Sequence, residues 1–165
     1  MASALMSILV TAPLAVSAAA QTEGSPIEAL LDLSWKSQHW AVVEVHQEEP
    51  QYAIVVDRAS IVVGANSNER EVNYLLFEAR KPPRSGAVAR IRLDCSTMAL
   101  RSMSGVEYRD GKRQGAAQSP EDRPVTVTPD KHAFANMKAV CTGNWGEVLV
   151  VDGPIEAVHA MVFPN

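Results

Sequence analysis

Hydrophobic and polar residues alternate along most of the chain between residues 39 and 110, which is the period of a β-strand. In the stretch ARIRLDC at residues 89–95, Ala, Ile, Leu and Cys alternate with Arg, Arg and Asp. The same period predicts six strands, separated by polar or Pro-containing segments, at residues 39–46, 52–56, 61–65, 70–80, 87–95 and 99–110. We place turns at residues 48–51, 57–60 and 66–69 and expect an antiparallel meander.

The pattern changes after residue 110. Residues 111–129 contain two glycines, three prolines and several charges, which predicts either a long surface loop or a ragged edge strand. Residues 130–141 have helical spacing, with Phe134, Met137 and Cys141 on one face. We expect Asp130 to cap the start of this helix and Gly143 to follow its end. A strand at 147–151 and a short helix at 154–161 complete the pattern.

The first 20 residues have the features of a signal peptide. They carry no charged side chain, have an apolar middle from residue 4 to 16, and end in three alanines before Gln21. The alternative is a disordered Ala-rich tail. A transmembrane span is not expected, because Ser7, Thr11 and Pro13 interrupt a run shorter than the ~20 residues that cross a bilayer.

The length of 165 residues predicts one domain. We divide the chain into a signal peptide (1–20), an N-terminal segment with a short helix or turn (21–38), an antiparallel β domain (39–145) and a C-terminal extension packing on that domain (146–165). The fold class is α+β, mainly β: a twisted antiparallel sheet of about six strands with a C-terminal helix.

The chain has two cysteines, and each lies on an apolar face. Cys95 lies on a strand and Cys141 on the helix, so the two faces are expected to pack together. In an oxidising compartment two such thiols form a disulfide. The alternative is a pair of buried free cysteines in a cytosolic protein. A bridge would tie the helix to one face of the sheet.

The charge pattern excludes some functions and suggests one surface. A net charge of −4 argues against general nucleic-acid binding. Arg90, Arg92 and Arg101 are predicted to project from neighbouring strands, which would form a basic stripe for an anionic glycan or acidic protein. The alternative, which we favour, is cross-strand pairing of these arginines with Glu71, Glu78 and Glu107.

Catalytic and metal-binding patterns are not recognisable. The four histidines form neither H-x-x-x-H nor H-E-x-x-H, and Glu44 and His46, which share one strand face, favour a surface pair over a metal site. Ser104 lacks the G-x-S-x-G frame of a hydrolase. We therefore expect no enzymatic activity, no cofactor and no metal.

Scattered residues between Trp40 and Cys141 suggest a family. They are Trp40 at the first strand, Asp57 to Ile61 in the early turn, Leu93 to Cys95, Tyr108, and Pro124 to Pro129 leading into a helix that ends Ala139-Val140-Cys141. This run resembles the bacterial surface-adhesin protein E-like domain. The resemblance implies a six-stranded twisted sheet, a helix tied to it by a disulfide, and export to the periplasm or cell surface.

Together these observations predict an exported, non-enzymatic interaction module. Its partner would be an extracellular or envelope protein or an anionic glycan, bound by an adhesin-like surface. The module could also form a homodimer. The alternative is a periplasmic structural or envelope-maintenance protein that has no host ligand.

Overall fold

The computed structural model of the protein describes residues 31–79, 85–118 and 123–164. The predicted signal peptide, residues 1–20, lies outside these ranges, as does the start of the predicted N-terminal helix. Residues 31–34 are helical, in agreement with a short helix in this segment.

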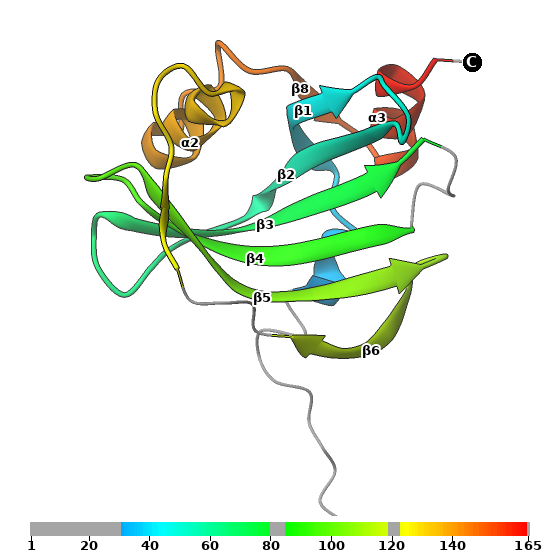
Figure 1. Ribbon diagram of the computed structural model, residues 1–165, viewed down its shortest axis with the longest axis horizontal. Coiled ribbons are helices and arrows are strands. Elements are labelled where there is room, and N and C mark those ends of the chain that lie inside the picture. The colour runs from blue at the N-terminus through cyan, green and yellow to red at the C-terminus, as the bar shows by residue number, and fades with distance from the viewer. Residues whose placement is uncertain (1–30, 80–84, 119–122, 165) are drawn as a thin grey trace, which may run out of the picture.

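The strands form one antiparallel sheet in the order β6-β5-β4-β3-β2-β1-β8, with β7 paired to β5 (Figure 1). The predicted fold class is confirmed, but the sheet has eight strands. The strands predicted at 52–56 and 61–65 form one strand, β6 and β7 form within residues 111–129, and β8 pairs with β1. The strands are β1 (His39–His46), β2 (Tyr52–Val63), β3 (Glu69–Glu78), β4 (Gly86–Asp94), β5 (Ala99–Arg109), β6 (Lys112–Gln118), β7 (Val125–Thr126) and β8 (Val150–Asp152).

The turn predicted at residues 57–60 is wrong, because the chain continues as one long strand. The polar residues instead form a bend inside β2, where the pairing with β3 shifts between Asp57 and Val62. The carboxylate of Asp57 accepts the backbone N–H of Ala59 (3.1 Å), and the hydroxyl of Ser60 donates to the Asp57 carbonyl (2.7 Å). The Ser60 hydroxyl also accepts the Asn73 N–H (2.7 Å), so side chains replace the missing ladder bonds.

The predicted helix at residues 130–141 is α2 (His132–Thr142). Gly143 ends it in the left-handed conformation, with φ of 74°, as expected. Asp130 does not cap it: the position before the helix is Lys131, without a side-chain cap, and the Asp130 carboxylate accepts the Thr128 hydroxyl instead. A second helix, α3 (Ile155–Val162), follows β8.

The predicted disulfide is present. Cys95, directly after β4, is bonded to Cys141 in the last turn of α2, with the two Cα atoms 5.6 Å apart. The bridge fixes α2 to the end of β4.

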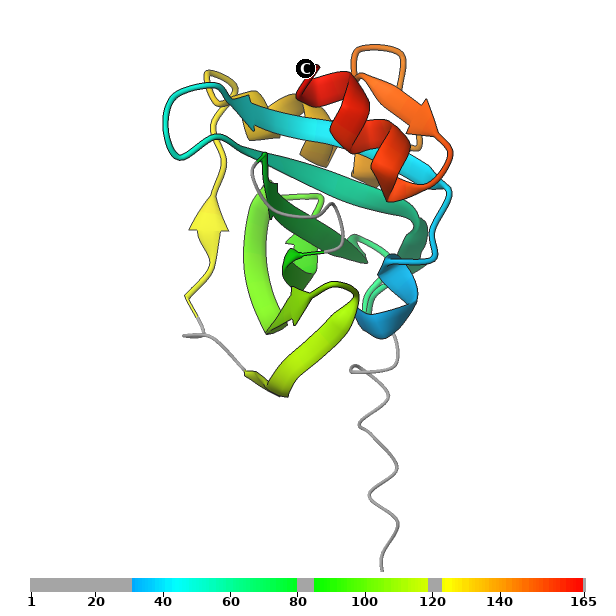
Figure 2. The ribbon, with the colours of Figure 1, turned by 90° about the vertical axis from the view of Figure 1, so that its right-hand side faces the viewer.

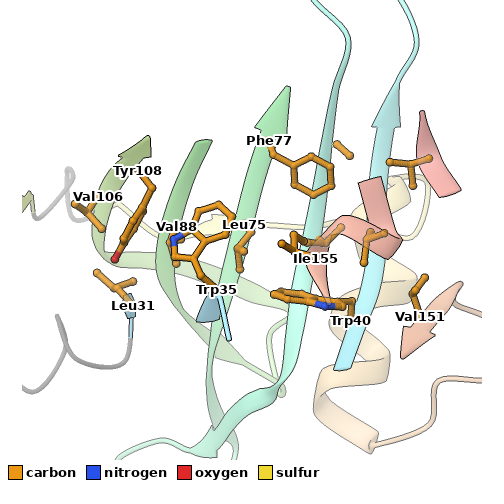
Figure 3. Close-up of a cluster of buried hydrophobic side chains, with 14 residues drawn as sticks. Leu31, Trp35, Trp40, Leu75, Phe77, Val88, Val106, Tyr108, Val151 and Ile155 are labelled. Atoms are coloured by element: carbon orange, nitrogen blue, oxygen red, sulfur yellow. The ribbon is translucent and has the colours of Figure 1, made fainter. Parts of the chain in front are cut away.

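Both faces of the sheet carry buried hydrophobic residues. The inner face bears Trp40, Leu75 and Phe77, over which lie α3 and residues 31–35 (Figure 3). The outer face bears Ala41, Val56, Val72 and Leu93, over which α2 packs. Figure 2 shows β6 curling toward the helical segment that begins at residue 31. Each large side chain buried in this way contributes roughly 1.5–3 kcal/mol.

Candidate functional site

The predicted basic stripe does not form, because Arg90 is fully buried. It shares a strand face with Val88, which belongs to the inner core, and its hydrogen-bond partner Asn73 is bonded to Ser34. The Arg90 Nη1 donates to the Ser60 carbonyl (2.9 Å) and to Asn73 Oδ1 (3.0 Å). Burial lowers the pKa of Arg90, against the opposing effect of Glu71. Arg90 is therefore an internal residue and not part of a binding surface.

Arg92 lies beside Arg90 and is paired instead of free. Its Nε and Nη2 atoms donate to Glu71 Oε1 at 3.1 and 2.8 Å, and Arg90 Nη2 lies 3.5 Å from the other Glu71 oxygen. This is the cross-strand pairing favoured from the sequence, but the ion pairs of the described residues show it for Glu71 only and not for Glu107. Arg101 is exposed and lies directly opposite Arg92 on β5.

Next to Arg90, a network of polar side chains joins the sheet to the segment that precedes β1. The Ser34 hydroxyl accepts a hydrogen bond from Asn73 Nδ2 (2.6 Å), and the Ser37 hydroxyl donates to Asp57 Oδ1 (2.5 Å). Burial raises the pKa of Asp57, while these serines act in the opposite direction. The network holds the bend of β2 and the N-terminal segment against the sheet.

Two histidines form surface pairs. His46 stacks on Tyr52, with ring centroids 4.8 Å apart, and the Tyr52 hydroxyl donates to Glu44 (3.2 Å). His39 Nδ1 lies 3.0 Å from Asp152, and this contact with His39 lowers the pKa of Asp152. Over the described ranges, no group of three His, Cys, Asp or Glu side chains is placed to hold a metal ion.

A concave feature lies on the outer face, where β4, β5 and β6 carry small residues. Ala87, Ala89 and Gly105 form its floor, and Ala116 of β6 extends it. The depression has a volume of about 470 Å³. The helix α2, which packs on β1 and β3, lies at the left-hand end of the sheet in Figure 1.

A second depression of about 280 Å³ continues the first along β5, and Leu76 lies on its β3 side. The two share Ala87, Glu107 and Gln114, so they form one channel, which we call the outer groove. Glu107 stands opposite Ala87 on one side and Gln114 on the other. The outer groove is thus an open channel whose floor consists of small residues and whose centre holds the carboxylate of Glu107.

Sequence reasoning missed the outer groove. Its signal was present, since Ala87 and Ala89 occupy alternate positions of one strand and Gly105 falls on the next. The alternation of apolar and polar residues does not predict which part of an apolar sheet face a helix distant in sequence will cover. The structure shows that α2 covers the part on β1 and β3 and leaves the small residues of β4 and β5 open.

Among the helices that the structure describes, none has both the length and the apolar character that crossing a bilayer requires.

Comparison with known proteins gives structural neighbours only. No protein-family model matches the chain, and no curated protein matches it in sequence. Three solved structures of Haemophilus influenzae protein E are similar to it. One (crystal form II) is 15% identical and covers 62% of this chain and 87% of its own, with a TM-score of 0.41. A second is 16% identical, covers 66% and 88%, and has a TM-score of 0.43.

The third, from a non-typeable strain, is 16% identical and covers 73% of this chain and 86% of its own, with a TM-score of 0.42. At these scores the likeness does not tell which molecule the chain binds.

Proposed function

We propose that the protein is an exported interaction module that binds a protein partner through the outer groove. The observation that carries this proposal is the open channel over β4, β5 and β6, which no helix within residues 31–79, 85–118 and 123–164 fills. Ligand sites commonly have volumes of ~300–1,000 Å³, and the larger depression falls in that range. A channel with a floor of small residues brings a partner close to the sheet backbone, which suits an extended polypeptide.

The disulfide supports export. Cys95 and Cys141 are bonded, and such bonds persist mainly in oxidising compartments such as the periplasm or the cell surface. A partner met in those compartments is an envelope or extracellular protein. The proposed activity is binding alone, without catalysis.

Filling the groove tests this function. Ala89→Leu places a larger side chain on the floor, and Ala65→Leu, at an exposed loop position, is the matched control. A photo-crosslinking residue at Gln114 should give a discrete adduct in cells that produce the protein, whereas one at Gln47, exposed outside the groove, should not. The adduct should then be identified and the partner purified.

With the purified partner, Ala89→Leu should weaken binding about tenfold or more, as for the loss of a central contact, and Ala65→Leu should not change it. Equal affinities of both variants and the wild type would refute the groove as the binding site. Unchanged circular dichroism of Ala89→Leu would establish that the variant is folded.

A further inference from the structure

Glu107 lies at the centre of the outer groove and lines both of its depressions. Its side chain is exposed and stands between the small side chain of Ala87 on β4 and the amide of Gln114 on β6. Any molecule that fills the channel from one depression to the other must pass this carboxylate.

The charge of Glu107 is not compensated within the part of the chain that the structure describes. The ion pairs found there join other residues, among them Arg92 with Glu71 and Arg58 with Asp152, and none involves Glu107. Arg109, two residues along the same strand face, lines the end of the second depression without reaching ion-pair distance of Glu107.

The floor beside this carboxylate is apolar and shallow. Ala87, Ala89 and Gly105 offer methyl groups and bare backbone instead of long side chains. A lysine or arginine side chain has the complementary form, because its methylene stem packs on apolar surface while its charged end reaches a polar group. A second carboxylate, that of Glu78, lines the second depression. An apolar floor with Glu107 at its centre and Glu78 further along therefore favours a side chain of that type.

We propose that the outer groove takes a lysine or arginine side chain of an extended partner polypeptide, with Glu107 as its counterion. This inference rests on the proposed function and adds the chemistry of the partner. A polypeptide fits better than a small cation, because the channel continues past Glu107 over both depressions, of about 470 and 280 Å³.

Three fluorescent octapeptides test the inference, one alternating Lys and Ala, one alternating Glu and Ala, and one alternating Ser and Ala. Fluorescence anisotropy at low salt should show binding of the Lys-Ala peptide, weaker binding of the Ser-Ala peptide and none of the Glu-Ala peptide. Glu107→Gln should weaken Lys-Ala binding about fivefold, the upper range for an exposed ion pair. Raising the salt concentration should reduce the difference between wild type and variant.

Matched variants make the result specific. Glu48→Gln removes an equally exposed carboxylate from the turn before β2 and should have no effect. Arg109→Gln removes the positive charge at the end of the groove and should strengthen Lys-Ala binding. Gln114→Glu adds a further carboxylate directly beside Glu107 and should do the same.

The outcomes separate the two proposals. If Ala89→Leu abolishes peptide binding while Glu107→Gln leaves it unchanged, the groove binds polypeptides regardless of their charge. In that case the role of Glu107 as counterion is refuted, whereas the proposed function stands. If Glu-Ala and Lys-Ala peptides bind equally, the inference fails as well. If Ala89→Leu changes no binding, the groove is not the site and both proposals fail.

Discussion

The hydroxyl of Ser37 donates a 2.5 Å hydrogen bond to Oδ1 of Asp57, across a separation of 20 residues. This contact joins the segment before β1 to the bend of β2. The same Asp57 oxygen also accepts the backbone N–H of Ala59. One carboxylate therefore bonds both to the bend of β2 and to the segment before β1. Asp57 is buried, and its ionisation therefore couples the stability of this region to pH.

We expect Asp57 to make the protein less stable as pH rises. Burial raises the pKa of Asp57 in the folded state above the usual 3.8, so the folded protein binds the proton more tightly than the unfolded chain does. The resulting stabilisation is complete below pH 3.8 and is lost as pH rises through the folded-state pKa. Asp57→Asn keeps an acceptor oxygen but does not titrate. Urea unfolding of both proteins from pH 3 upward should show wild type losing stability relative to Asp57→Asn above about pH 4.

Asp94 supplies the control of opposite sign. Its carboxylate accepts hydrogen bonds from Ser96, which lower its pKa below 3.8. Its contribution is present above the unfolded pKa and is lost as pH falls through the folded pKa. Relative to Asp94→Asn, wild type should therefore gain stability with rising pH. A wild-type minus Asp57→Asn difference that stays flat or rises with pH would contradict the assignment for Asp57.

The disulfide should be a major source of stability. Cys95 and Cys141 are separated by 46 residues, and closing a loop of that length restricts the unfolded chain by about 4 kcal/mol. This is large beside a total of roughly 5–15 kcal/mol for a domain. Cys95→Ser should lower the melting temperature by about 10 °C in oxidising buffer. In reducing buffer wild type and variant should melt alike; an equal loss in both buffers would point to packing, not to the bridge.

The hydroxyl of Tyr74 forms no hydrogen bond with the described residues. The group is buried, and burial raises the pKa of the phenol far above its usual value. Tyr74→Phe removes the unsatisfied group and should stabilise the protein by about 1–2 kcal/mol in urea unfolding.

Tyr108 is the matched control, because its hydroxyl is bonded to Asp32. Tyr108→Phe should destabilise by about 1 kcal/mol. If Tyr74→Phe also destabilised the protein, its hydroxyl would have a partner, such as an internal water.

The sequence predicted the sheet well because its signal is local. Alternation located β1, β4 and β5 to within a residue or two, since half-buried strands alternate wherever they pair. The pairing of Cys95 with Cys141 followed from the same patterns, because each cysteine lay on an apolar face. The N-terminal residues of α2 were less predictable, since Thr128 engages the side chain of Asp130.

The bend of β2 was misread as a turn for a physical reason. The residues Asp57, Arg58, Ala59 and Ser60 have turn chemistry, and their side chains do bond to nearby backbone groups. The strand survives because Ser60 also bonds to β3, a contact 13 residues away in sequence that composition does not reveal.

Arg90 and the outer groove were missed because they depend on what covers each face. Alternation put Arg90 on a polar face, but Arg90 is buried there and bonds to Asn73, which in turn bonds to Ser34. It put Ala87 and Ala89 on an apolar face, but α2 covers only another part of it. In both cases the decisive contact is made by an element distant in sequence.

The two glycines at the groove should respond to alanine in opposite ways. A Cβ at Gly105 would lie 3.6 Å from the Val88 carbonyl oxygen and 3.8 Å from the Ala89 Cβ, which are ordinary contacts. Gly105→Ala should therefore stabilise the protein by about 0.4–1 kcal/mol, because it restricts the unfolded chain. The same methyl group raises the groove floor and should weaken binding of the Lys-Ala peptide.

Gly86→Ala provides the contrast, since its Cβ would lie 2.0 Å from the Leu76 carbonyl oxygen. The clash is with backbone of the paired strand and should cost about 1–3 kcal/mol. Urea unfolding and peptide anisotropy on both variants measure the two effects. Higher stability with weaker binding in Gly105→Ala is the expected combination, because a bare glycine gives up strand stability and leaves room for the partner. Unchanged binding in Gly105→Ala would mean that the partner does not reach the floor.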